Sequence, residues 1–170
     1  MDESKIANNR NDIDWLPNLV TLEEYGGNWI EYNENIYSIF CSNFIDNPPV
    51  LNNKRVNVDR TIEDGKFKGF WHITSEKGEY ERCKRIKWPR PLISNYSQHS
   101  SIFWWENERP KDRINLLILL RFIDPTEHDY LIVLKKCKQS YFLITAYPIE
   151  HKHQIKKYVR EYKEFWNITE

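Results

Sequence analysis

Glycine is scarce in this chain, and its scarcity excludes several kinds of ligand-binding loop. The 170 residues include 5 glycines. A Walker-type phosphate loop and a dinucleotide-binding turn both need closely spaced glycines at fixed positions. Neither pattern occurs in the sequence. We therefore expect no bound nucleotide cofactor, and no other motif in the chain indicates a cofactor.

Cysteine is also sparse, with Cys41, Cys83 and Cys137 far apart in the chain. An odd number of widely spaced cysteines is typical of reduced thiols, so we expect a cytoplasmic protein without disulfides.

His151 and His153 are two residues apart, a spacing that places two side chains on different sides of a helix. No cluster of histidine, cysteine and carboxylate residues has the spacing of a metal site, and we predict none.

Long apolar runs are missing as well. The longest, Ile114–Leu120, is interrupted by Asn115 and is far shorter than the roughly 20 residues that span a bilayer. The first residues, Met-Asp-Glu-Ser, lack a basic region followed by an apolar run. We therefore expect neither a signal peptide nor a membrane partner.

The net charge of zero conceals an uneven distribution. Residues 1–64 carry 5 Lys and Arg against 12 Asp and Glu, a net of −7, whereas residues 65–113 carry 11 against 6, a net of +5. This layout predicts either an anionic partner for the basic middle or a fold in which the acidic third covers it.

Hydrophobic periodicity predicts a single α+β domain over residues 1–170. Residues 1–14 are polar, and we expect them to be poorly ordered. Residues 15–49 form the helical part: Asn28 has the character of an N-cap, and apolar residues follow it at spacings of three and four. The pattern then predicts a twisted antiparallel sheet over residues 50–148 that carries the site, and a closing helix over residues 150–166.

The segment Lys66–Ser75 has the alternation of a strand with one apolar face. On its other, solvent-facing side we expect Lys66, Lys68, Phe70, His72 and Thr74 together. A histidine between lysines on the solvent-facing side of a sheet is our first candidate for a catalytic group.

The segment Arg82–Arg90 is strongly basic and contains no acidic residue. Its five cations and one tryptophan are Arg82, Lys84, Arg85, Lys87, Arg90 and Trp88. Arginine binds phosphate oxygens in bidentate fashion and tryptophan offers a stacking plane, so the segment fits an anion-binding strand. An ordinary solvated strand remains the alternative.

Two further strands carry candidate residues. In Tyr141–Pro148, Thr145 and Tyr147 share a face with Tyr141 and Leu143, so two hydroxyl groups lie side by side at the end of a strand. In Trp104–Trp105 adjacent residues face opposite sides of the sheet. One of the two tryptophans is expected in the core, and we take Trp105 as the candidate for contacting a base.

The order of these parts resembles the barnase/EndoU/colicin/RelE-type nuclease superfamily, and more narrowly its phage-encoded and toxin-type members. The resemblance rests on a strand with Lys-x-Lys-Gly-x-x-His-Ile, on the arginines after it and on a late strand ending in Thr-x-Tyr. It covers roughly residues 65–148. The chain departs from the pattern in lacking a second histidine soon after His72 and in its closing helix.

The resemblance implies a metal-independent endoribonuclease, of a toxin, phage or defence type, that cleaves RNA by attack of the 2′-hydroxyl. The implied catalytic residues are His72 as base, Arg85 or Arg90 as the basic group, and Thr145 with Tyr147. The implied substrate-binding residues are Lys66, Lys68, Arg82, Lys87, Trp88 and Trp105. RNA, with transfer RNA as one candidate, and an antitoxin or immunity protein are the implied partners.

Two other classes stay open at this point. The first is a nucleic-acid-binding module that uses the same basic segment without cleaving RNA. The second is a protein-interaction or inhibitor module that binds through the acidic N-terminal third.

Overall fold

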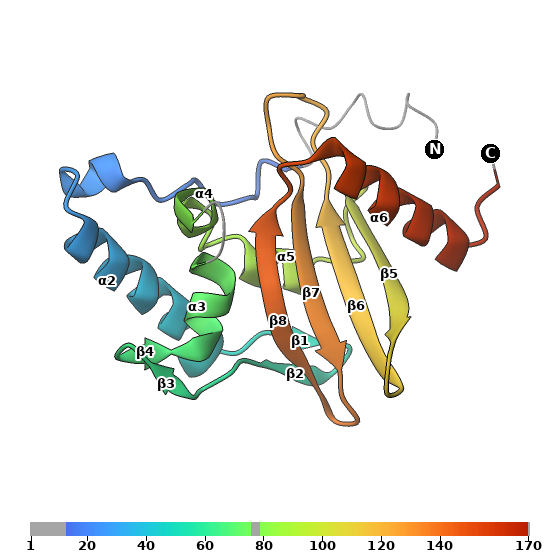
Figure 1. Ribbon diagram of the computed structural model, residues 1–170, viewed down its shortest axis with the longest axis horizontal. Coiled ribbons are helices and arrows are strands. Elements are labelled where there is room, and N and C mark those ends of the chain that lie inside the picture. The colour runs from blue at the N-terminus through green and yellow to red at the C-terminus, as the bar shows by residue number, and fades with distance from the viewer. Residues whose placement is uncertain (1–12, 76–78, 170) are drawn as a thin grey trace.

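The protein is described by a computed structural model that covers residues 13–75 and 79–169. The expectation of poor order for residues 1–14 therefore falls almost wholly outside the described residues. The chain folds as α+β, with helices first, then a curled sheet, then a helix (Figure 1).

The N-terminal part is helical, as its periodicity predicts. It consists of η1 (Leu22–Tyr25), α2 (Trp29–Phe40) and the π-helical turn η2 (Cys41–Asp46). Asn28 caps α2, because its side-chain oxygen accepts a hydrogen bond of 3.1 Å from the Glu31 amide. The apolar stripe of α2 is buried against the rest of the domain at Tyr32, Ile36 and Phe40.

The main sheet has the order β1-β2-β8-β7-β6-β5. Its strands are β1 (Val50–Leu51), β2 (Lys54–Asn57), β5 (Ile102–Arg109), β6 (Arg113–Leu120), β7 (Tyr130–Lys136) and β8 (Ser140–Pro148). Neighbours are antiparallel except β2 and β8, which are parallel, so the sheet is mixed and the prediction of a purely antiparallel sheet is wrong at that pair. β6 lies between β7 and the edge strand β5, and it is buried on both faces from Asn115 to Leu120, as its apolar run favours.

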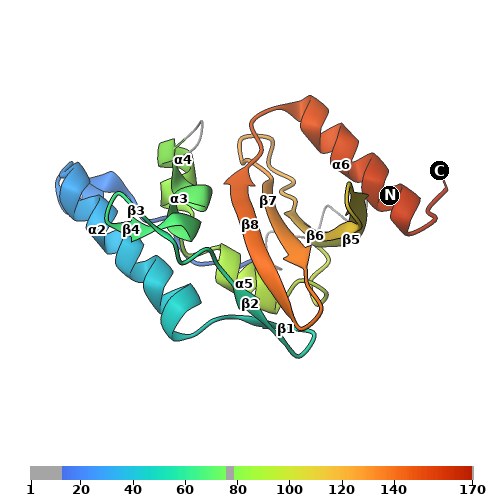
Figure 2. The ribbon, with the colours of Figure 1, turned by 60° about the horizontal axis from the view of Figure 1, so that its bottom comes forward.

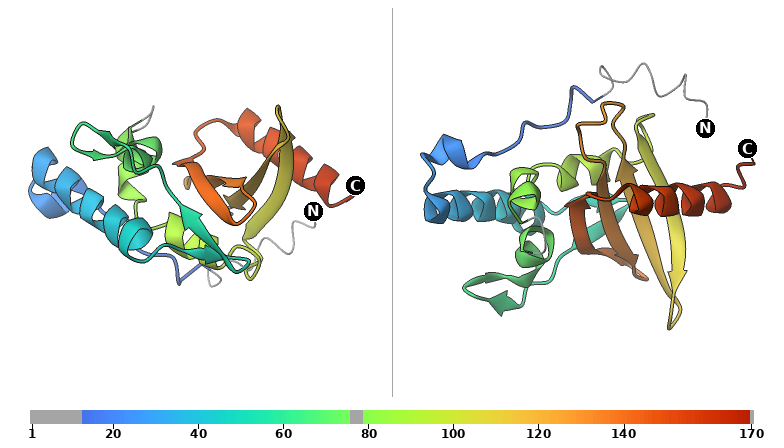
Figure 3. Two further views of the ribbon diagram at one scale, coloured as in Figure 1. Left: turned by 90° about the horizontal axis from the view of Figure 1, so that it is seen from below. Right: turned by 45° about the horizontal axis from the view of Figure 1, so that its top comes forward.

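The two faces of the sheet bury separate cores. The closing helix α6 (Lys152–Phe165) lies across the curl of the sheet, where Tyr158 and Tyr162 pack over Trp105, Leu117 and Leu131 (Figure 3). The opposite face packs against α2 and the short helices between the N-terminal part and β5 (Figure 2). The predicted closing helix is thus confirmed.

The segment Lys66–Ser75 is mostly helical, which corrects its prediction as a strand. Only β4 (Lys66–Phe67) is extended, paired with β3 (Ile62–Glu63) through the Asp64–Gly65 turn, and α3 (Lys68–Thr74) follows directly. Phe70 and Thr74, predicted on the solvent-facing side, are buried. Their spacing of four residues puts them on the same side of a helix, and burial of that side outweighs the β-propensity of the aromatic residues.

The basic segment is also helical and not a strand. It is divided between α4 (Glu79–Lys84) and α5 (Pro89–Ser94), with a turn between them. Pro89 begins α5, a position where its missing N–H costs nothing. In place of one basic strand face, the cations of this segment therefore point in several directions.

Gly69 allows α3 to sit close to the chain that follows β2. A Cβ atom on Gly69 would lie 3.0 Å from the Val58 Cβ and 3.1 Å from the Asp59 amide nitrogen. The Gly69 amide donates a hydrogen bond of 2.9 Å to the Asp59 carbonyl. This close approach fixes the position of α3, and with it the position of His72.

Candidate functional site

A pocket of about 500 Å³ opens beside the C-terminal half of β8. It is lined by His72, Arg82, Phe142, Ile144, Thr145, Tyr147 and Gln154. The sheet leaves room for it because β2 pairs only with Ser140–Phe142 of β8. Beyond that point α3 and α4 lie alongside the strand in place of another strand (Figure 2). The pocket thus lies between two helices and the unpaired edge of β8.

A β-bulge in β8 determines which side chains line the pocket. Val133 of β7 pairs with Thr145 and Leu134 pairs with Leu143, so Ile144 is the extra residue. The bulge reverses the alternation of side chains along the strand. Tyr141 and Leu143 are buried in the core, while Phe142 and Ile144 line the pocket together with Thr145 and Tyr147. The expectation that Thr145 shares a face with Tyr147 is confirmed, and the expectation that both share it with Tyr141 and Leu143 is wrong.

His72, Arg82 and Thr145 are linked through the backbone of α3. The Thr145 hydroxyl donates a hydrogen bond of 3.1 Å to the His72 carbonyl. The Arg82 Nη1 lies 3.3 Å from the same carbonyl and 3.5 Å from the Thr145 hydroxyl oxygen. α3, α4 and β8 each supply one of these residues, so the group forms only in the folded chain.

Tyr147 provides the ring against which Arg82 packs. The Arg82 guanidinium carbon lies 4.9 Å from the centre of that ring, within the range of a cation–π contact. The Tyr147 hydroxyl is 2.9 Å from the Tyr158 hydroxyl of α6. The Arg82 guanidinium therefore packs against the Tyr147 ring at the pocket wall, and α6 fixes the orientation of that ring.

The His72 side chain has a buried ring nitrogen whose bonding is incomplete. Its Nδ1 makes no hydrogen bond to any group in residues 13–75 or 79–169. A buried polar atom without a partner is costly, and such atoms are often found where a residue serves catalysis or a ligand. His72 thus combines a place in the pocket wall with an imidazole nitrogen that the described residues leave unused.

A carboxylate lies on the α3 side of the site. Hydrogen bonds from Thr61 lower the pKa of Asp59, and the nearby His72 and Lys68 lower it further. The Thr61 amide donates to the Asp59 carboxylate at 2.9 Å. Asp59 is therefore ionised at neutral pH and places a negative charge near His72. Lys68, a predicted substrate-binding residue, also lies near Asp59 but does not line the pocket.

Arg85 and Arg90, the arginines predicted as catalytic, do not line the pocket. Arg85 is buried and its Nη1 donates to the Glu81 carboxylate at 2.8 Å. The Arg90 Nη1 donates to the carbonyls of Asn43 and Asn47, at 2.7 Å for Asn43, and so binds the end of η2. Both arginines hold helices in place, because the helical fold of their segment directs them away from β8. The prediction that they meet His72 is wrong.

The two tryptophans predicted to contact a base are core residues. Trp88 is buried, and its indole N–H donates to the Pro17 carbonyl at 2.9 Å. Trp105 is fully buried under α6, and its indole N–H donates to Glu161 at 3.1 Å. Trp104, on the opposite face, is only partly buried, so the prediction that the pair divides between two faces is confirmed. Trp105 was the wrong choice for the exposed member.

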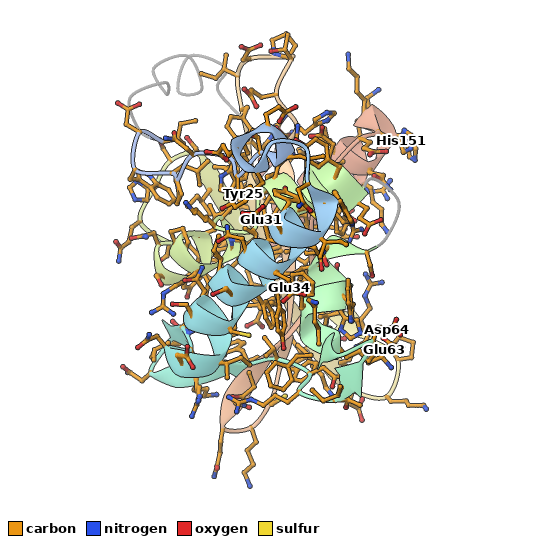
Figure 4. All side chains as sticks on the ribbon, turned by 90° about the vertical axis from the view of Figure 1, so that its left-hand side faces the viewer. Tyr25, Glu31, Glu34, Glu63, Asp64 and His151 are labelled. Carbon is orange, nitrogen blue, oxygen red and sulfur yellow. The ribbon has the colours of Figure 1, made fainter. Side chains whose placement is uncertain are left out.

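The remaining predicted lysines lie outside the pocket. Lys87 is exposed on the surface near Arg90. Lys66 forms an ion pair with Glu34 of α2. Figure 4 shows Glu31 and Glu34 on α2 and Glu63 and Asp64 on the β3–β4 hairpin. The acidic N-terminal third therefore contacts the basic middle at Lys66.

Three pocket residues escaped the sequence prediction. Alternation predicts Phe142 and Ile144 on the strand face opposite Thr145 and Tyr147, because it gives no sign of a bulge. Gln154 lies in the first turn of α6, and nothing in its sequence neighbourhood distinguishes it from a surface residue. Arg82 was predicted only to bind substrate, yet it is the arginine beside His72 and Thr145.

Among the described residues, no group of three or more histidine, cysteine, aspartate or glutamate side chains is arranged to hold a metal ion. In the same part of the chain, every helix is too short or too polar to cross a bilayer.

No family model, no curated protein and no solved structure matches this chain. Its function must therefore be argued from the pocket itself.

Proposed function

We propose that this protein is an endoribonuclease that cleaves RNA by attack of the 2′-hydroxyl on the adjacent phosphate. The observation that carries the proposal is the convergence of His72, Arg82, Thr145 and Tyr147 on one pocket. These residues come from three separate elements, α3, α4 and β8. Their side chains provide a titratable imidazole, a permanent cation and two hydroxyl groups.

The reaction makes three demands that these groups meet. The 2′-hydroxyl loses a proton as its oxygen bonds to phosphorus, the pentacovalent phosphorane gains negative charge, and the 5′-oxygen takes a proton as its bond to phosphorus breaks. Histidine exchanges protons near neutral pH, so His72 is assigned as the base. Arg82 stabilises the phosphorane charge, because a guanidinium held in a partly dry site acts strongly on developing charge.

The two hydroxyl groups have separate tasks in this scheme. In the free protein Thr145 donates its one hydroxyl hydrogen to the His72 carbonyl, and rotation of the hydroxyl would redirect that hydrogen to a phosphate oxygen when RNA binds. Tyr147 is held by Tyr158 and lies against Arg82, so it is assigned as the donor of a proton to the 5′-oxygen. The products are a 2′,3′-cyclic phosphate and a 5′-hydroxyl, and every proton is accounted for by His72 and Tyr147.

The apolar end of the pocket suits the rest of a nucleotide. Phe142 and Ile144 lie along β8 on one side of the polar group. An aromatic ring at a nucleic-acid site accepts a base by stacking without regard to its sequence. We therefore place the scissile phosphate at Arg82 and a neighbouring base against Phe142.

The test is incubation of the purified protein with total RNA or transfer RNA in excess EDTA. We expect cleavage with 2′,3′-cyclic phosphate ends, and a loss of roughly 10²- to 10⁴-fold in rate for His72→Ala, the usual contribution of a general base. His99→Ala is the matched control, because His99 stacks on Trp15 outside the pocket. Circular dichroism checks that both variants fold.

Other outcomes separate the alternative functions. RNA that is bound with steep salt dependence but left intact would indicate a binding module and overturn the nuclease proposal. Growth arrest on expression, relieved by His72→Ala, would identify a toxin. Full cleavage by His72→Ala would remove the catalytic assignment of His72.

A further inference from the structure

A second pocket lies on the far flank of α6 from the His72 pocket. It has a volume of about 740 Å³ and is bounded by α6, the chain after it and Arg121 at the end of β6. Its apolar floor is made by Ile155, Val159 and Ile168. We call it the α6 groove.

Cations predominate around the α6 groove. Arg121, Lys156, Arg160 and Lys163 line it, against the single carboxylate of Glu164. Arg121 is fixed by Asp129, whose carboxylate lies 3.2 Å from its Nε. The contact between Arg160 and Glu164 spans 4.0 Å on an exposed surface, so it is worth little and is easily exchanged for another anion.

The same helix connects the groove to the His72 pocket. Gln154 faces that pocket. Lys156 and Arg160 follow Gln154 by two and six residues, which places them about 200° and 240° around the helix axis from Gln154. Lys157, exposed and 4.0 Å from Glu161, lies between the two flanks. The solvent-facing side of α6 between the two pockets therefore carries Lys156, Lys157 and Arg160 against Glu161 and Glu164, which makes a band with an excess of positive charge.

We propose that this band and the α6 groove bind the phosphate backbone of the RNA strand that extends beyond the His72 pocket. The proposal rests on the proposed function for the identity of the ligand. A polyanion complements a groove with four cations and one carboxylate, on a chain whose net charge is zero. α6 is about 10–12 Å wide with its side chains, so only a strand of several nucleotides reaches both sites.

The direct test measures binding of a long single-stranded RNA with 2′-O-methyl riboses, which cannot be cleaved by 2′-hydroxyl attack. Fluorescence anisotropy is recorded across a salt series for the wild type and for the double variant Lys156→Gln with Arg160→Gln. Each lost phosphate contact lowers the slope of log affinity against log salt by about 0.7 for single strands. For the double variant we expect a slope shallower by about 1.4 than that of the wild type. The ratio of wild-type affinity to variant affinity should therefore fall about sevenfold between about 50 and 200 mM salt.

The matched control is the double variant Lys135→Gln with Lys138→Gln. Both lysines are exposed at the β7–β8 hairpin, at the end of the sheet away from α6 (Figure 1). The change in net charge is identical, so this variant should keep the wild-type slope. Equal slopes for the two double variants would overturn the α6 groove as an RNA site and would leave a general effect of charge.

Cleavage kinetics separate this proposal from the proposed function. Lys156→Gln with Arg160→Gln should raise the KM for long RNA severalfold and leave cleavage of a dinucleotide unchanged, because a dinucleotide occupies only the His72 pocket. Normal cleavage of long RNA by this variant would refute the groove and keep the nuclease. Binding that depends on Lys156 and Arg160 without any cleavage would keep the groove and refute the nuclease.

Discussion

Arg82 and Arg85 are three residues apart, both buried and both packed on an aromatic ring, yet their surroundings differ in kind. The Arg82 guanidinium carbon is 4.9 Å from the centre of the Tyr147 ring, and that of Arg85 is 5.1 Å from the centre of the Trp88 ring. Arg82 lines the pocket beside Thr145 and the His72 carbonyl. Arg85 is enclosed between Glu81 and Trp88.

The difference shows that the element an arginine reaches decides whether the arginine lines a pocket. Arg85 has a carboxylate acceptor from its own helical segment, and that ion pair ties α4 to the following turn. Arg82 reaches across to β8, where the bulge and the missing neighbouring strand leave a pocket. We therefore expect substitutions of Arg82 to affect activity and substitutions of Arg85 to affect stability.

Between the two arginines, the larger effect on activity is expected for Arg82→Gln. Removing one group that stabilises a transition-state charge costs about 10²- to 10³-fold in kcat. RNA cleavage assays should show this loss, and a thermal melt should show a smaller change in stability than for Arg85→Gln. Arg82→Lys keeps the charge but loses the planar fork, so it should restore activity only in part. Wild-type kcat for Arg82→Gln would contradict the assignment.

Arg85→Gln should lower the stability of the fold more than the rate of cleavage. Its hydrogen bonds to Glu81 involve a charged acceptor, and such bonds contribute about 1.5–3 kcal/mol. Because Glu81 is partly exposed, its carboxylate regains water when Arg85 is removed, and we expect a loss of about 2 kcal/mol in unfolding free energy. Urea denaturation measures this loss. Among molecules that remain folded, the rate of RNA cleavage should stay within a few-fold of the wild type.

The contrast between the two arginines could not be predicted from the sequence, whereas most of the fold could be. The Asn28 cap, the buried β6 strand, the β7–β8 hairpin and α6 follow from periodicity and capping. The error lay in α3, where Phe67, Trp71 and Ile73 alternate as in a strand. Phe67, Phe70 and Thr74 fit a helix equally well, and in so short a segment only tertiary packing decides between the two periods.

The site was predictable in its residue types and not in its geometry. His72, Thr145 and Tyr147 were identified from the sequence, and the structure brings them to one pocket with Arg82. The choice among the arginines failed because a helical segment directs Arg82 and Arg90 to different elements. Gln154 was missed because its place in the pocket depends on how α6 returns over the sheet, a long-range contact that leaves no local signal.

The smallest effect expected on the Arg85 side is a dependence of stability on pH. Burial raises the pKa of Glu81, but the hydrogen bonds from Lys84 and Arg85 outweigh burial and hold the pKa below its usual value of 4.5. A carboxyl group with a lowered pKa in the folded state stabilises the fold above pH 4.5, and this contribution is lost as the pH falls through the folded pKa. The wild type should therefore exceed Glu81→Gln in unfolding free energy at neutral pH, and the excess should shrink in acid.

Urea denaturation of the wild type and Glu81→Gln over a pH series measures that excess, and subtracting the two curves removes contributions from the other carboxyl groups. A difference that stays constant with pH would show that Arg85 and Lys84 do not hold the Glu81 carboxylate as described. The cleavage rate of folded Glu81→Gln should match that of the wild type at every pH, because Glu81 does not line the pocket. A shifted pH profile of cleavage would instead mean that the surroundings of Arg85 and the pocket of Arg82 act as one unit.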